Sequence, residues 1–98
     1  INLSNLKSDD LIAESDFQKG ITAFKNGNYS SAVTFLKKIK PSQNIYYQTQ
    51  LFLAYSFIKL NSWDAAGNAL QTAKQSEDFE LKVDKSTFVS ESELSYIA

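Results

Sequence analysis

Several residue types are missing from the chain, and their absence excludes whole classes of site. The chain has 98 residues, and none of them is cysteine or histidine. Without cysteine it can build neither a disulfide scaffold nor a thiolate metal site. Histidine and cysteine are also the usual general base and thiol nucleophile of enzymes. A chain without cysteine is compatible with the cytoplasm and with a bacterial envelope alike, so the compartment stays open.

The basic residues are all lysine, and the formal net charge is -1. Bidentate recognition of phosphate or guanine depends mainly on arginine. A net charge close to zero also gives no general attraction to nucleic acid or to an anionic membrane. We therefore expect no nucleic-acid partner.

Methionine is absent too, so we expect the chain to be a processed form or an excised domain of a longer protein. The longest apolar run lies within residues 51–58 and is far shorter than the ~18–20 residues that span a bilayer. We expect no membrane span. With 43% hydrophobic and 21% charged residues, the composition is that of one ordinary globular domain.

A repeat organises what is present. Residues 17–40 and 51–74 are related by a shift of 34 positions, which is the period of a helix–turn–helix repeat. The residues in most pairs are alike in size or in turn chemistry, and in the last pair a large apolar residue is matched by a smaller one. The pairs are Gly20 with Ala54, Phe24 with Ile58, Gly27 with Asn61, Asn28 with Ser62, Tyr29 with Trp63, Ala32 with Ala66, Leu36 with Leu70, and Ile39 with Ala73.

Helical spacing of apolar residues predicts helices at about 9–26, 29–40, 45–60 and 63–76. Gly27 can adopt positive φ at the end of the first helix, and Asn28 and Ser62 can cap the helices that follow the turns. Pro41 predicts the end of the second helix, because the residue before a proline is pushed out of helical geometry.

The third predicted helix has almost no polar face in its second half, so we expect neighbouring helices on several of its sides. The fourth has small residues on its inner face, which implies a close approach of two helices. Gly67 in this helix costs about 1 kcal/mol relative to alanine. Such a residue usually lies where another backbone comes near.

The remaining segments are less regular. Phe79, Leu81 and Val83 alternate with charged residues, which we interpret as an extended linker. Ser90 and Glu93 form a capping box that starts a fifth helix, either a truncated third repeat or a closing helix. The predicted division of the chain is a lead-in at 1–8, two hairpins within 9–80 (9–40 and 45–76), and the linker with the last helix at 81–98.

These residues resemble the tetratricopeptide repeat family. That family places small residues at its eighth and twentieth positions, where this chain has Gly20 and Ala54, then Ala32 and Ala66. The chain departs from the pattern at the fourth position and at the late proline. The departing residues are Asp16 and Gln50 at the fourth position, and Asn44 and Asp78 in place of the proline.

The resemblance implies an all-α, right-handed α-solenoid of antiparallel helix pairs, about five helices in all. It also implies that the first helix of each pair lines a concave groove for a peptide or a partner helix. Members that clamp a terminal carboxylate use Lys, Asn and Arg, whereas here the groove has an apolar floor and a lysine rim. The residues implied are Glu14, Phe17, Ile21 and Lys25 from the first repeat, and Gln48, Leu51, Tyr55 and Lys59 from the second.

Several conspicuous residues have an ordinary structural explanation. Tyr29 and Trp63 could anchor a partner, but their shared repeat position favours packing between helices. The adjacent Tyr46 and Tyr47 favour helix entry into the core over ligand binding. The cluster of Lys37, Lys38 and Lys40 favours a solvated helix end over an anion site.

We expect no catalytic site, no metal and no cofactor. The glycines are scattered rather than gathered into a phosphate loop, and no spacing of carboxylates typical of a calcium loop occurs. Asp9 with Asp10, and Glu91 with Glu93, lie at helix starts, where the helix dipole favours negative charge.

The pattern therefore predicts a non-enzymatic scaffold that binds another protein through the concave face. The alternative hypothesis is a structural element that self-associates through its open C-terminal end, because a solenoid end needs a polar closing face. The residues at this end, Tyr96, Ile97 and Ala98, do not supply one.

Overall fold

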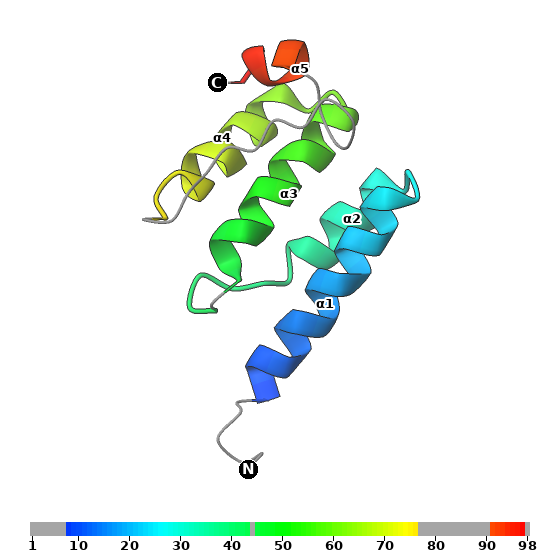
Figure 1. Ribbon diagram of the computed structural model, residues 1–98, viewed down its shortest axis with the longest axis vertical. Helices are drawn as coiled ribbons and strands as arrows, with labels where there is room; N and C mark the ends of the chain where they lie inside the picture. Colours follow the sequence, from blue (N-terminus) through cyan, green and yellow to red (C-terminus); the bar gives the residue numbers. More distant parts are fainter. Residues whose placement is uncertain (1–7, 44, 77–90, 98) are drawn as a thin grey trace.

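The computed structural model describes residues 8–43, 45–76 and 91–97, and all of this part is helix, turn or loop without a β-strand. Figure 1 shows two antiparallel helical hairpins side by side, with a short fifth helix beyond the second. Helix α2 packs against both α1 and α3. The all-α class is thus confirmed for the described residues. The helices are α1 (Ser8–Lys25), α2 (Tyr29–Leu36), α3 (Tyr46–Lys59), α4 (Trp63–Ala73) and α5 (Glu91–Ser95).

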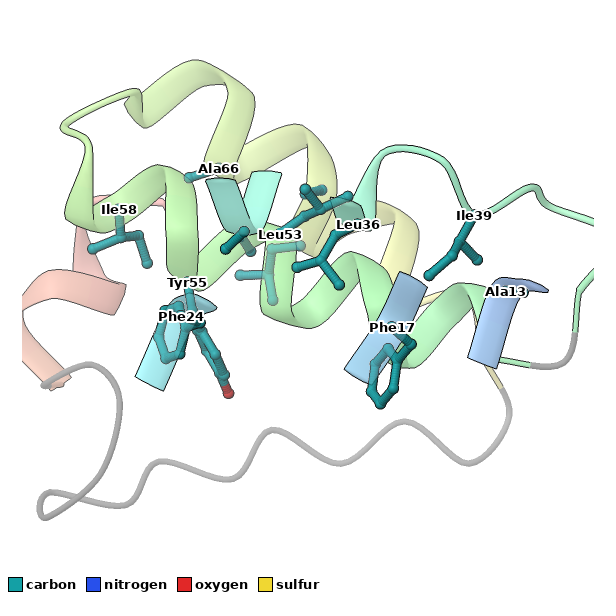
Figure 2. Close-up of a cluster of buried hydrophobic side chains, with 13 residues drawn as sticks. Ala13, Phe17, Phe24, Leu36, Ile39, Leu53, Tyr55, Ile58 and Ala66 are labelled. Atoms are coloured by element: carbon teal, nitrogen blue, oxygen red, sulfur yellow. The ribbon is translucent and has the colours of Figure 1, made fainter. Parts of the chain in front are cut away.

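Residues 34 positions apart occupy the same environment in the two hairpins. Ala32 and Ala66 are each completely buried, and so are Leu36 and Leu70. Ile39 and Ala73, the last pair of the repeat, are buried as well. Figure 2 shows several of these side chains pointing into one apolar cluster between the helices. The small residues of the repeat therefore lie in the core, on the inner faces of the helices.

The two hairpin turns share one backbone geometry. Gly27 has φ 82° and Asn61 has φ 60°, both in the left-handed region. The amide of Asn28 donates to the carbonyl of Ala23, and the amide of Ser62 donates to that of Phe57, each at 2.8 Å. These are the six-residue bonds of a Schellman motif, which satisfies carbonyls at a helix end. Positive φ at Gly27 was predicted, and it is confirmed.

The predicted caps are only half right. Asn28 and Ser62 do occupy the positions that precede α2 and α4, but neither side chain makes a capping hydrogen bond. Their backbone amides are instead used in the Schellman bonds of the preceding helices. The turn geometry is therefore carried by the backbone and not by the cap side chains.

Helix α2 is shorter than predicted. It ends at Leu36 and not at residue 40, so Pro41 does not terminate it. The amides of Lys38 and Ile39 donate to carbonyls only three residues back, at 3.2 and 3.3 Å. Such tightened bonds end a helix while still satisfying its last carbonyls. They also leave Ile39 buried in the core after the helix has ended.

Helix α3 is enclosed as predicted, with α1, α2 and α4 packed around it. Its interior includes two hydroxyl residues, Thr49 and Ser56, which are completely buried. The Thr49 hydroxyl donates to the carbonyl of Ile45 at 2.7 Å, and the Ser56 hydroxyl donates to that of Phe52 at 2.9 Å. Since each hydroxyl donates to a carbonyl four residues earlier in the chain, burial leaves neither of them unsatisfied.

The closest approach of two helices is at Gly20 of α1. A Cβ atom built there would lie 2.6 Å from Cγ and Cδ2 of Leu36 on α2. The sequence predicted a nearby backbone at Gly67, and the carbonyl oxygen of Ile97 does lie there, but at an ordinary 3.9 Å from a Cβ built on Gly67. Gly20 is therefore required by packing, and Gly67 is not.

We expect Gly20→Ala to be less stable than Gly67→Ala by about 1–3 kcal/mol, the usual penalty for overpacking a filled core. Both changes gain the same helix propensity of about 1 kcal/mol, so their difference isolates the contact with Leu36. Urea unfolding of the two variants measures it. Equal stabilities would contradict the close approach of α1 and α2.

Candidate functional site

The eight residues predicted to line a groove all lie on α1 and α3, and the structure brings these two helices together. The residues come in pairs at equivalent helical positions, 34 apart. On α1 they are Glu14, Phe17, Ile21 and Lys25, and on α3 they are Gln48, Leu51, Tyr55 and Lys59.

Four rings join α1 to α3, and we call Phe17, Phe24, Phe52 and Tyr55 the aromatic cluster. The Phe52 ring lies edge-on to Phe17 and Phe24 at 6.0 and 6.1 Å. Figure 2 shows the rings of Phe24 and Tyr55 side by side, and the centres of the two rings are 6.4 Å apart. Edge-to-face pairs of this kind add about 0.5–1.5 kcal/mol each beyond the area that they bury.

Two of the predicted groove residues belong to the core. Phe17 is 8% exposed and Tyr55 only 2%. Both lie in the aromatic cluster, so their first role is to hold α1 against α3. Ile21 and Leu51 are half-buried and keep part of their apolar surface accessible. Of the four apolar residues predicted for the groove floor, two are therefore inaccessible to a partner.

The polar members of the predicted set lie at or near the surface. Glu14, Lys25 and Gln48 are exposed. The fourth, Lys59, is held by Glu93 of α5, with Nζ 3.2 Å from Oε1. Both side chains of this ion pair are roughly one-quarter to one-third exposed, so the pair contributes at most about 1 kcal/mol. It nonetheless fixes α5 beside the end of α3.

The sequence did not foresee how α5 and the two residues after it meet the second hairpin. The Tyr96 ring lies 5.0 Å from that of Trp63, and Ile97 lies against Gly67. With the ion pair to Lys59, these contacts place the segment beside the end of α3 and the start of α4, at the top of Figure 1. Trp63 therefore packs between helices, as does Tyr29, whose ring lies 5.4 Å from Phe24.

The lysines that follow α2 cover aromatic rings. Nζ of Lys37 lies 5.7 Å from the Phe57 ring, and Nζ of Lys38 lies 5.3 Å from the Phe35 ring. Cation–π contacts at exposed sites contribute about 0.5–1 kcal/mol. Lys40 is exposed, and its amide donates to the Gln43 side chain within the turn. These three lysines therefore lie at a solvated helix end, as the sequence analysis favoured over an anion site.

The tyrosine pair at the start of α3 is also partly structural. The rings of Tyr46 and Tyr47 meet edge-on at 5.4 Å. Tyr46 packs against the core, whereas Tyr47 is 37% exposed.

Within the described ranges, no three carboxylates converge into a metal-binding group. The predicted linker at Phe79, Leu81 and Val83 lies outside the described residues.

Burial raises the pKa of the Tyr55 phenol above its ordinary value of 10.0, because desolvation disfavours the phenolate. The folded chain therefore keeps this proton at a pH where the unfolded chain has lost it. The stability that Tyr55 contributes is complete below pH 10 and is lost as the pH rises through the higher folded pKa.

We expect the free energy of unfolding to fall from about pH 10 upward, and to fall less in Tyr55→Phe. Urea unfolding at a series of alkaline pH values measures the difference between the two chains. Tyr47→Phe is the matched control, because Tyr47 is exposed. An identical pH dependence for wild type and Tyr55→Phe would show that Tyr55 ionises freely.

None of the described helices is both long and apolar enough to span a membrane. Comparison of the chain with models of known protein families, with curated proteins and with solved structures finds no match.

Proposed function

We propose that the chain is a tetratricopeptide-like, non-enzymatic scaffold that binds an amphipathic segment of another protein along α1 and α3. The observation that carries this proposal is the equivalence of the two hairpins. Gly27 and Asn61 share their backbone geometry, and the pairs of Ala32 with Ala66 and Leu36 with Leu70 share their burial. This equivalence supports a solenoid of stacked helix pairs, in which the first helices line one face.

The chemistry of that face favours a particular kind of partner. Ile21 and Leu51 offer apolar surface, and Lys25 offers an exposed positive charge at the end of α1. An amphipathic helix docks in a groove through apolar residues at spacings of three and four. A partner segment with apolar residues at this spacing and acidic residues beside them complements both features.

The buried rings limit the depth of the interaction. Because Phe17 and Tyr55 are committed to the core, a partner contacts the surface above them and does not insert between them. The interface with the partner is then small, and polar residues make up much of it, as in weak and transient complexes. We therefore expect a modest affinity whose association depends on salt.

A library of displayed peptides, selected against the immobilised chain, tests the proposal. We expect enrichment of peptides with helical apolar spacing and Asp or Glu. Fluorescence anisotropy with one such synthetic peptide should show binding weakened about tenfold by Lys25→Glu, which corresponds to about 1.4 kcal/mol. Lys40→Glu is the matched control, since Lys40 is exposed and follows α2.

Two results would overturn the docking proposal. One is a selection that enriches no helical, acidic motif. The other is equal weakening by Lys25→Glu and Lys40→Glu, which would show attraction to the overall charge and not to a groove on α1 and α3.

Self-association through the C-terminal end is the second candidate. Tyr96, which follows α5, is 72% exposed although its ring also meets Trp63. An aromatic side chain this exposed at the end of a helical stack is a natural contact for a second copy. A stack that joined copies there would use the same residues that close the second hairpin.

This candidate predicts that the sedimentation coefficient of the wild type rises with protein concentration. The rise should vanish in Tyr96→Ser and persist in Tyr47→Ser, a control that removes another exposed tyrosine. A wild type that stays monomeric at its highest soluble concentration would rule this candidate out.

A further inference from the structure

One face of α3 receives the first hairpin. The Phe52 ring meets the Phe17 and Phe24 rings of α1, and the Phe57 ring lies under Lys37, which follows α2. Between them, Leu53 and Ser56 are buried. We call this the receiving face of α3. Its members, with one residue at the end of α3, are Phe52, Leu53, Ser56, Phe57 and Leu60.

The equivalent face of α1 is found 34 residues earlier, and it is open. Four residues of α1 occur there, together with Asn26, which directly follows the helix, and they line a shallow, open depression of about 450 Å³ between α1 and α2. We call them the end face of α1. They are Gln18, Lys19, Thr22, Ala23 and Asn26. A hairpin stacked before α1, in the way that the first hairpin stacks on α3, would lie in this depression.

The chemistry of the two faces is opposite. Where α3 has Phe52, α1 has Gln18, and where α3 has Leu53, α1 has Lys19. Leu60 is replaced by Asn26, and Phe57 by the much smaller Ala23. Covering the end face with an apolar helix would desolvate the Lys19 ammonium and the amides of Gln18 and Asn26, at a cost of several kcal/mol. Of the two amides, Gln18 donates to Glu14 Oε1 at 3.3 Å. The end face is therefore suited to exposure to solvent.

The large apolar residue of the depression is already covered. Phe35 of α2 lies beneath two lysines, with Nζ of Lys19 at 5.9 Å and Nζ of Lys38 at 5.3 Å from its ring. Lysines place their apolar stems along such a surface and keep the charged end in water. A helix stacked on Phe35 would have to displace both.

The other end of the molecule differs. There α5 and the two residues that follow it cover the second hairpin, through the Lys59–Glu93 ion pair and the contact of the Trp63 and Tyr96 rings. The Tyr96 side chain still exposes most of its surface. The two ends are therefore not complementary to each other: one is polar and charged, and the other is capped by a helix with an exposed aromatic ring.

We infer that the end face of α1 terminates the helical stack, so that neither a preceding repeat nor a second copy of this chain packs on it. Terminal repeats of solenoids carry polar outer faces for this reason. A head-to-tail contact generates open filaments, whereas a contact between like ends closes as a two-fold dimer. Self-association of this chain is thereby limited to a closed pair through the α5 end. The inference rests on the proposed repeat architecture.

Restoring the chemistry of α3 to α1 tests the inference. The variant Gln18→Phe/Lys19→Leu places on the end face the residue types found at the equivalent positions of the receiving face. The matched control, Gln71→Phe/Lys74→Leu, makes the same changes at two exposed positions near the end of α4. Sedimentation equilibrium measures the mass of each chain across a concentration range, and circular dichroism checks that each is folded.

We expect the wild type and the control to remain at or below the mass of a dimer, and the end-face variant to grow beyond it. If the end-face variant grows no more than the control does, the end face of α1 has no receiving geometry and the inference is wrong.

A second measurement needs only the wild type. Lys19 and Lys38 should react with an amine-acylating reagent at rates that do not change with protein concentration. A wild type that grows past a dimer, or protection of these two lysines at high concentration, would also overturn the inference. If the chain grows past a dimer, or the lysines become protected, while peptides still bind, the end-face inference is wrong and the docking proposal stands. If peptides do not bind but the chain stays at or below a dimer, the docking proposal is wrong and the end-face inference stands.

Discussion

The spacing of the helices depends on the contact between Gly20 and Leu36. Because α1 has no side chain at this position, the Leu36 side chain of α2 lies almost directly on its backbone. Ala54 occupies the equivalent position of α3 and is completely buried, as are Ala32 and Ala66 on the second helices. Small residues at these crossings bring two helices close enough for the large side chains beside them to fill the space between.

The aromatic cluster turns the two hairpins into one body. Phe52 of α3 contacts both Phe17 and Phe24 of α1, so the first helices are joined directly and not only through α2. This has a consequence for binding. Rings that hold the scaffold together cannot also open to admit a ligand, so the accessible part of this face consists of half-buried aliphatic residues and a polar rim. The docking surface that we propose is therefore shallow and has a polar rim.

The repeat pattern predicted the features that are set by local sequence. The positive φ of Gly27, a turn at Asn61 and the placement of Ala32 and Ala66 on inner helix faces were predicted from residues a few positions apart, and all are found. Features set by distant neighbours were missed. Tyr55 was assigned to a groove, but its burial depends on rings from α1, and the partner of Lys59 comes from α5. The end of α2 at Leu36 was missed because tightened bonds, and not Pro41, end the helix.

The Schellman turns also bear on how the chain folds. Each turn closes through hydrogen bonds that span no more than six residues, such as that from Asn28 to Ala23, so each hairpin can nucleate within its own short segment. Proteins dominated by contacts of low sequence separation fold quickly, since little loop-closure entropy is lost before the contacts form. The pairing of Phe17 with Phe52 joins much more distant positions. These ring contacts can form only after α3 has been synthesised, because they join the first helix to a segment that follows the whole first hairpin.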